Sequence, residues 1–242
     1  TVVVNADDSR LTQLPANKTF GIDQTADFHP DRIEQIVPKV SFVKSGIYFT
    51  GTLPGEHNLS NILAALCTSS VCGCAEERLR SAIESFQGVQ RRFTVHTLGG
   101  GIICIDDYAH NPEKIRAALH CAQLLDGRVF ALFQPHGFGP LRVLRPQLVE
   151  MFAQPLRATD RLILLPVYYA GGTARKDISS NDIARELRNV STLTVFTPRS
   201  RNSALQILSK RVTPGNCILS MGARDPTLSA FSRQIEKTIQ PD

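Results

Sequence analysis

The stretch Ile102-Ile-Cys-Ile-Asp-Asp-Tyr-Ala-His-Asn-Pro112 decides the fold of this chain. Its four apolar residues, three of them β-branched, predict a buried strand that ends in Asp106 and Asp107. Pro112 then suits the first turn of a helix, which we expect to run to Leu125. A strand, a polar turn and a helix in this order form the first half of a β-α unit.

The same pattern continues toward the C-terminus. Strands are predicted at 129–133, 161–166, 192–197 and 217–221, and helices at 144–152, 181–187, 203–210 and 227–238. Repeated β-α units predict an α/β fold with a mostly parallel sheet covered by helices on both faces. Ligands gather at the carboxyl ends of such strands. Three further polar clusters fall at these ends: Gln134-Pro-His136, Tyr168-Tyr-Ala-Gly-Gly172 and Met221-Gly-Ala-Arg-Asp225.

The first part of the chain has a different pattern. Thr1-Val-Val-Val4 reads as a buried strand, and because a chain rarely opens in mid-strand we expect further residues upstream. Short apolar runs broken by Gly and Pro predict strands and hairpins over 11–50, and helices are expected at 58–70 and 76–86. The polar joint Gly88-Val-Gln-Arg-Arg92 follows, so we predict two domains, 1–88 and 89–242.

Composition excludes several classes of protein. No apolar run approaches the roughly 20 residues that span a bilayer. The six cysteines lack the paired spacing of a zinc site, so we expect buried thiols in a reducing cytosol and no metal cluster. The net charge of +5 is spread thinly and without an aromatic-basic stripe. This favours solubility or small anions as its role rather than nucleic acid.

Three clusters have both a structural and a chemical interpretation. In Asp106-Asp-Tyr-Ala-His110, a carboxylate can bind nucleotide hydroxyls and a histidine can position a substrate carboxylate, or the run is an Asx-type turn before the next helix. In Gly55-Glu-His-Asn-Leu-Ser-Asn61, Asn58 or Ser60 caps a helix, or the amides pair with an adenine edge. The adjacent arginines before Phe93 are solvated charge, or a fork for ribose and phosphate oxygens.

Taken together, four motifs resemble those of Mur ligases in order and spacing: Gly55-x-His-Asn-x-x-Asn61, Gly88-Val-x-Arg-Arg-Phe93, Asp106-Asp-Tyr-Ala-His110-x-Pro112 and Phe133-Gln-Pro-His136. The resemblance covers the chain from Asn5-Ala-Asp-Asp8 to the region of Gly222. It is closest to the branch that adds L-alanine to UDP-N-acetylmuramate, which includes the ligase that recycles murein tripeptide.

The resemblance implies a three-domain enzyme with a UDP-sugar domain, a central ATPase domain and a C-terminal Rossmann-like domain. Residues 1–88 would be the latter part of the central domain, and residues 89–242 the C-terminal domain. ATP, with Mg²⁺, would phosphorylate the carboxylate of a UDP-muramyl-type sugar nucleotide. The amine of an amino acid or peptide would then attack the acyl phosphate. The implied place is the cytoplasm and the implied process is peptidoglycan synthesis or recycling.

The family's functional residues carry over by position. Implied nucleotide-binding residues are His57, Asn58 and Asn61 at the adenine, and Arg92 and Asp107 at the ribose and phosphates. Implied catalytic residues that face the condensing substrates are Tyr108, His110 and His136.

Two departures from the family's pattern qualify this picture. The chain contains no Gly-x-x-Gly-Lys-[Ser/Thr] phosphate loop and no Glu or His before Asn5 to hold magnesium, so by itself it should not hydrolyse ATP. The alanine-adding enzymes carry arginines just after Gln-Pro-His, whereas here Gly137-Phe-Gly-Pro-Leu-Arg142 leaves only Arg142. We therefore expect an added group other than plain L-alanine, with Arg142, Tyr168 and Arg224 as candidate substrate contacts.

A non-catalytic module is the main alternative. Such a protein would keep the Rossmann-like half of a ligase and bind a nucleotide or a partner. The upstream sequence separates the two hypotheses, because a ligase needs the phosphate loop and a module does not.

Overall fold

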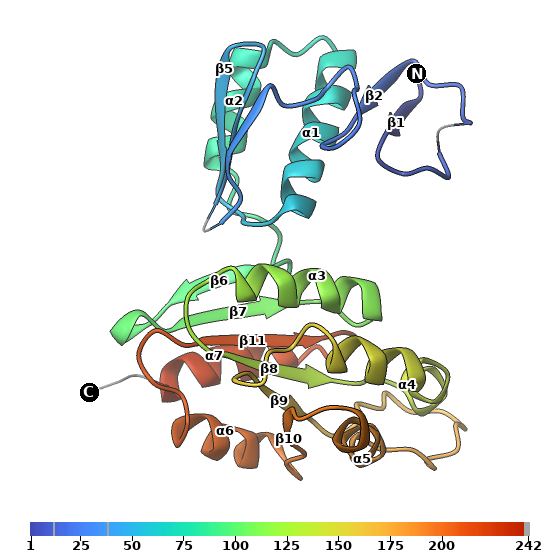
Figure 1. Ribbon diagram of the computed structural model, residues 1–242, viewed down its shortest axis with the longest axis vertical. Coiled ribbons are helices and arrows are strands. Elements are labelled where there is room, and N and C mark those ends of the chain that lie inside the picture. Colours follow the sequence, from blue (N-terminus) through green and yellow to red (C-terminus); the bar gives the residue numbers. More distant parts are fainter. Residues whose placement is uncertain (12, 38, 240–242) are drawn as a thin grey trace. The chain divides into compact units, whose positions relative to one another are not determined.

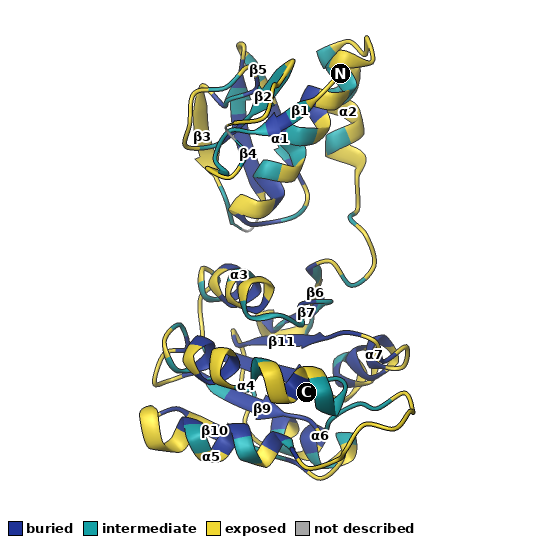
Figure 2. Ribbon diagram, turned by 90° about the vertical axis from the view of Figure 1, so that its right-hand side faces the viewer, coloured by how far each residue is buried: buried dark blue, intermediate teal, exposed yellow. Residues whose placement is uncertain are grey.

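The computed structural model describes residues 1–11, 13–37 and 39–239, which form two compact units, Thr1–Gly88 and Val89–Asp242. Figure 1 labels most of the helices and strands of each unit, and Figure 2 labels β3 and β4 as well. In the part of the chain so described, no helix is long and apolar enough to cross a membrane.

The first unit packs two helices against short strands. Strands β1 (Val3–Asn5) and β2 (Lys18–Phe20) pair in parallel. The antiparallel sheet contains β3 (Arg32–Gln35), β4 (Val40–Lys44) and β5 (Ile47–Gly51). The helices are α1 (Glu56–Val71) and α2 (Glu76–Ser85). Phe42 and Phe49 stack at 5.2 Å between ring centroids and pack with buried leucines of α1. The expectation of a buried strand from Thr1 was wrong at its start, because Thr1 and Val2 are exposed and only Val4 is buried.

The second unit contains a six-stranded sheet in the order β10-β9-β8-β11-β7-β6. Its strands are β6 (Thr94–Thr97), β7 (Ile103–Asp107), β8 (Val129–Gln134), β9 (Arg161–Leu164), β10 (Thr194–Phe196) and β11 (Cys217–Gly222). Every neighbouring pair is parallel except β6 with β7. The prediction of an α/β fold with a mostly parallel sheet is confirmed. Strand β6 was not predicted, because this edge strand has no buried residue to mark it.

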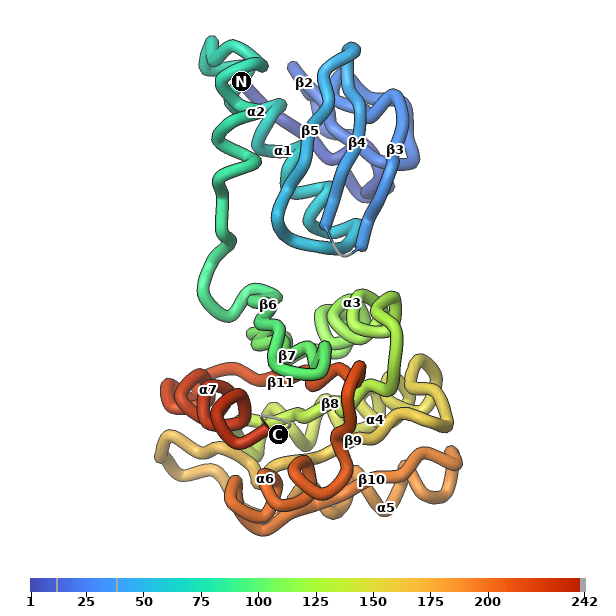
Figure 3. The backbone as a smooth tube through the Cα atoms, turned by 90° about the vertical axis from the view of Figure 1, so that its left-hand side faces the viewer, coloured from blue at the N-terminus to red at the C-terminus, as the bar shows by residue number. Residues whose placement is uncertain are grey.

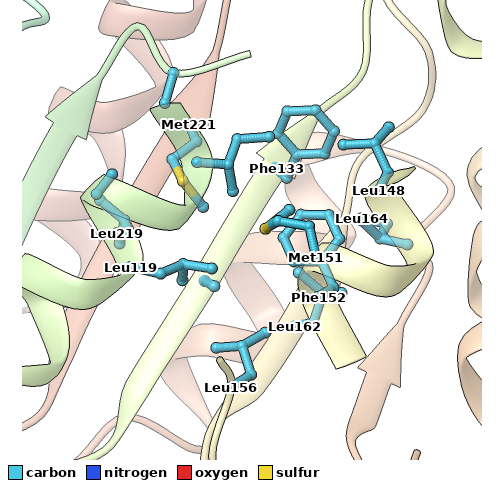
Figure 4. Packing of buried hydrophobic residues seen from close by; sticks show 14 of the residues in the cluster. Leu119, Phe133, Leu148, Met151, Phe152, Leu156, Leu162, Leu164, Leu219 and Met221 are labelled. Atoms are coloured by element: carbon cyan, nitrogen blue, oxygen red, sulfur yellow. The ribbon is translucent and has the colours of Figure 1, made fainter. Parts of the chain in front are cut away.

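Helices cover both faces of this sheet (Figure 3). One face packs against α3 (Pro112–Gln123), α4 (Phe138–Ala153) and α5 (Ser180–Val190), and the other against α6 (Arg201–Ser209) and α7 (Leu228–Thr238). Strand β8 is buried along its whole length, as is β11, whereas the helices bury only their inner sides (Figure 2). In Figure 4, Leu119, Phe133 and Phe152 come from a helix, a strand and a second helix of the same cluster. Burying each such side chain contributes about 1.5–3 kcal/mol.

Helix α4 starts six residues before its predicted start at 144. Its N-cap is Gly137, with φ 68°, and Pro140 lies in its first turn. Gly and Pro are poor helix formers in general, so the pattern placed the start too late. In a first turn, proline costs little because that N–H has no partner within the helix.

The cysteines are free thiols. Cys67, Cys104, Cys121 and Cys217 are buried as expected, but Cys72 and Cys74 are exposed after α1. Burial raises the pKa of Cys104 and Cys217 to about 12, so these two thiols stay protonated at neutral pH. Within the described ranges, no group of three or more His, Cys, Asp or Glu could hold a metal ion.

Candidate active site

The candidate site lies where β7, β8 and β11 end. Strand β11 pairs with both neighbours, so that Met221 is opposite Asp107 and Gly222 is opposite Gln134. A Cβ at Gly222 would lie 2.8 Å from Leu228 and 3.1 Å from the Gln134 carbonyl oxygen, so only glycine fits this close approach. The loops after these three strands therefore emerge side by side, as expected from the parallel sheet.

These loops bring four of the predicted residues together. The rings of Tyr108 and His110 meet edge to face with 5.5 Å between centroids, and His110 meets His136 in the same way at 5.5 Å. The Tyr108 hydroxyl accepts a hydrogen bond from the backbone N–H of Arg224 (3.4 Å). Residues from the loops after β7, β8 and β11 thus form one cluster, here called the histidine cluster: Tyr108, His110, His136 and Arg224.

The two histidines of the cluster have different surroundings. His110 Nδ1 lies 2.9 Å from the Tyr108 carbonyl oxygen, which can only accept, so Nδ1 carries the proton. Burial lowers the pKa of His136, and the positive charges of His110 and Arg224 lower it further. His136 is therefore neutral at pH 7 and able to take a proton.

Asp107 fixes the turn from which Tyr108 and His110 project. Its carboxylate accepts hydrogen bonds from the backbone N–H groups of Phe93 (2.7 Å) and Ala109 (2.6 Å). The second bond is that of an Asx turn, and Asn111 caps α3 by accepting from Lys114 N–H (2.9 Å). The turn interpretation of this run is therefore correct.

Arg91 is a residue whose importance sequence reasoning missed. Its guanidinium donates to the carbonyl oxygens of Gly222 (2.6 Å) and Asp225 (3.4 Å), and its Nε lies 3.7 Å from Asp106 Oδ1. Burial raises the pKa of Asp106, and Arg91 opposes that rise. A buried acid at a strand end requires a nearby cation, which was the available signal. The neighbouring Arg92 is exposed, with its guanidinium 5.8 Å from the Tyr108 ring centroid.

A second network behind the site was also missed. Arg201, at the start of α6, donates to Gln134 Oε1 (3.0 Å) and to Asp225 Oδ2. Asp225 is buried, and its other oxygen accepts from the backbone N–H of Thr227 (2.8 Å). These contacts tie the loop after β11 to the end of β8. No sequence motif marks Arg201, because the contact joins residues 67 and 24 positions apart.

Of the other two candidate substrate contacts, Arg142 has its side chain bound within the protein, and Tyr168 is held by its backbone. The exposed side chain of Arg142, on the first turns of α4, pairs with Asp177 and donates to the Arg175 carbonyl oxygen (3.2 Å). Tyr168 shapes the loop after β8 through its backbone: its N–H donates to the Pro135 carbonyl oxygen and its own carbonyl accepts from Gly137 N–H, both at 2.8 Å.

The three residues assigned to adenine lie on α1 of the first unit. Gly55, with φ 102°, is the N-cap, and no side chain caps this helix, so the capping interpretation of Asn58 and Ser60 was wrong. The buried Asn58 instead donates to the Pro54 carbonyl oxygen (2.7 Å), and Asn61 donates weakly to Asn58 Oδ1 (3.4 Å). His57 and Asn61 are exposed.

Comparison with known proteins gives consistent results. Residues 91–224 match the family model described as Mur ligase, glutamate ligase domain. UDP-N-acetylmuramate–L-alanine ligase of Pelotomaculum thermopropionicum is 32% identical over 233 residues, covering 90% of this chain and 49% of the relative. The ligase of the same name from Acetivibrio thermocellus is 31% identical over 174 residues, covering 72% of this chain and 36% of the relative. The chain thus spans about a third to a half of the length of these relatives.

A solved structure shows the same fold. The UDP-N-acetylmuramate-alanine ligase of Thermotoga maritima matches 98% of this chain and 51% of its own, with a TM-score of 0.75 and 23% identity.

Proposed function

The chain belongs to the Mur ligase family, and from that premise we propose that it is the C-terminal part of an ATP-dependent carboxylate–amine ligase. The intact protein would join an amino acid or peptide to a UDP-N-acetylmuramate-type sugar nucleotide in the cytoplasm, for peptidoglycan synthesis or recycling. Its relatives are ligases of this pathway by name. In this proposal residues 1–88 are the latter part of the ATP-binding domain and residues 89–242 the C-terminal domain.

The histidine cluster is the observation that supports the proposal best. Amide formation requires the amine to lose a proton as its nitrogen attacks the acyl phosphate carbon and phosphate leaves. His136 is neutral at pH 7 and half-buried, so it is suited to accept that proton. The rings of His110 and Tyr108, which lie beside His136, would orient the amine.

The nucleotide and the metal ion would rely on other residues. Arg92 and Asp107 would hold the ribose and phosphates of ATP, and His57, Asn58 and Asn61 the adenine. In support, Arg92 is exposed and forms no ion pair with the described residues. The chain contains no phosphate loop, so the phosphate and Mg²⁺ ligands would come from upstream. When bound, ATP supplies the phosphoryl group that activates the carboxylate.

The test is to sequence the gene upstream of Thr1 and to assay the full-length protein that it encodes. A Gly-x-x-Gly-Lys-[Ser/Thr] loop after a predicted strand is expected, together with phosphate release that depends on both the sugar nucleotide and an amino acid or peptide from a panel. A gene product without such a loop, or with nucleotide binding but no phosphate release, would favour the non-catalytic module instead.

A further inference from the structure

Arg224 occupies an unusual backbone conformation on the loop that follows β11. Its φ is 69°, in the left-handed region where residues with a Cβ are disfavoured. Arg224 is exposed, so packing does not require an arginine at this position, and glycine would meet the backbone requirement without strain. Strained non-glycine residues persist where the surrounding structure enforces them, and they cluster at functional sites.

The surrounding structure does enforce this conformation. Arg91 binds the carbonyl oxygens of Gly222 and Asp225, on either side of Arg224. The backbone N–H of Arg224 itself donates to the Tyr108 hydroxyl. Asp225 is buried and fixed by Arg201 and by the backbone N–H of Thr227. The loop is thus held from three sides, and the base of the Arg224 side chain is fixed in advance.

The guanidinium of Arg224 is the group that this loop presents. Within residues 1–11, 13–37 and 39–239, no hydrogen bond or ion pair of its guanidinium is found. By contrast, Arg91, Arg142 and Arg201 use their guanidinium groups on protein carbonyls and carboxylates. Arg224 lies close enough to His136 for its charge to act on that ring.

From these contacts we propose that Arg224 determines substrate specificity by binding the carboxylate of the incoming amine substrate, next to His136. The inference rests on the proposed ligase function and names the group that the site recognises. A guanidinium fork matches a carboxylate with two parallel hydrogen bonds, which places the rest of that substrate in a defined direction. The substrate class is then an amino acid or peptide with a free carboxylate.

The test compares an acid with its amide in the intact protein. The amino acid or dipeptide that releases most phosphate in the panel is assayed beside its C-terminal amide, which lacks the carboxylate. Wild-type protein should show a lower KM for the acid. In Arg224→Gly this preference should fall by about tenfold or more, because the charge pair is lost. Arg224→Lys should keep part of it. An unchanged KM ratio in Arg224→Gly would overturn the inference.

A second measurement, the melting temperature, tests whether the Arg224 side chain only stabilises the fold. Arg224→Gly removes the backbone strain, so the 242-residue chain should melt at a higher temperature than wild type, whereas Arg224→Ala keeps the strain and should not. A lower melting temperature for Arg224→Gly would mean that the side chain stabilises the fold, and would also overturn the inference. Absence of amide product from wild type with every acid would instead reject the ligase proposal itself.

Discussion

At the scale of single residues, two adjacent arginines have different surroundings. Arg91 is largely buried and holds together the ends of β7 and β11 through Asp106 and Gly222. Arg92 is exposed, and its guanidinium lies 5.8 Å from the centroid of the Tyr108 ring. The sequence marks them as a pair, but burial separates a residue that stabilises the site from one that is available to a ligand.

Replacing Arg91 by alanine should therefore destabilise the chain. The change leaves Asp106 without its cation and two carbonyl oxygens without a donor, which typically costs about 3 kcal/mol. Urea denaturation of the 242-residue chain measures this loss. The matched control Arg92→Ala should change the free energy of unfolding by less than about 0.5 kcal/mol. Equal effects of both changes would contradict these roles.

His136 should make the stability of the chain depend on pH. Its pKa is lower when folded than the ordinary value of 6.5, so between the two values the unfolded chain binds more protons. The free energy of unfolding should therefore rise with pH through that window and level off above 6.5. Denaturation curves at several pH values should show a smaller rise in His136→Gln. A rise that is unchanged in this variant would assign the effect to another group.

At the scale of helices and strands, the predicted boundaries were closest where an apolar run is bounded by clear signals. Pro112 and Asn111 marked the start of α3, and the buried run of β8 marked that strand. The prediction was poor at α4, whose first turn contains Gly139 and Pro140, and at β6, whose stability comes from pairing with β7. Such elements depend on tertiary contacts that local periodicity does not record.

A close approach at the amino edge of the sheet gives a prediction at this scale. A Cβ at Gly127 would lie 2.1 Å from the Gly215 carbonyl oxygen, and its φ is 99°. Gly127→Ala should therefore destabilise the second unit by about 1–3 kcal/mol or more. Gly139→Ala is the matched control: apart from the backbone of its own helix and its chain neighbours, no atom lies within 4 Å of the added Cβ. Alanine in a helix should stabilise by about 0.5–1 kcal/mol. Chemical denaturation of both variants checks the opposite signs.

At the scale of the whole molecule, each unit has its own hydrophobic core. The first is built around Phe42 and Phe49, and the second around β8 and β11. We therefore expect residues 89–242, expressed alone, to unfold cooperatively and to retain the NMR contacts between the rings of Tyr108, His110 and His136. A non-cooperative transition would show that the second unit depends on the first.

How far the candidate site followed from sequence depends on the residue. Strand-end clustering was enough to bring Tyr108, His110, His136 and Arg224 to one edge, because parallel strands end together. The pairing of Arg142 with Asp177 was not predictable, since the two lie 35 positions apart and no periodicity connects them. The adenine residues belong to the first unit, and their role stays a prediction.

The measurement that tests the central claim most directly is mass spectrometry of the sugar nucleotide after incubation of the intact protein with ATP, Mg²⁺, UDP-N-acetylmuramate and an amino acid or peptide panel. The ligase proposal predicts a new species whose mass is that of the sugar nucleotide plus the added amino acid or peptide, less one water. His136→Ala should form much less of this product, and the loss of product should be larger than its loss of nucleotide binding. An unaltered sugar nucleotide across the whole panel, despite bound ATP, would contradict the proposal.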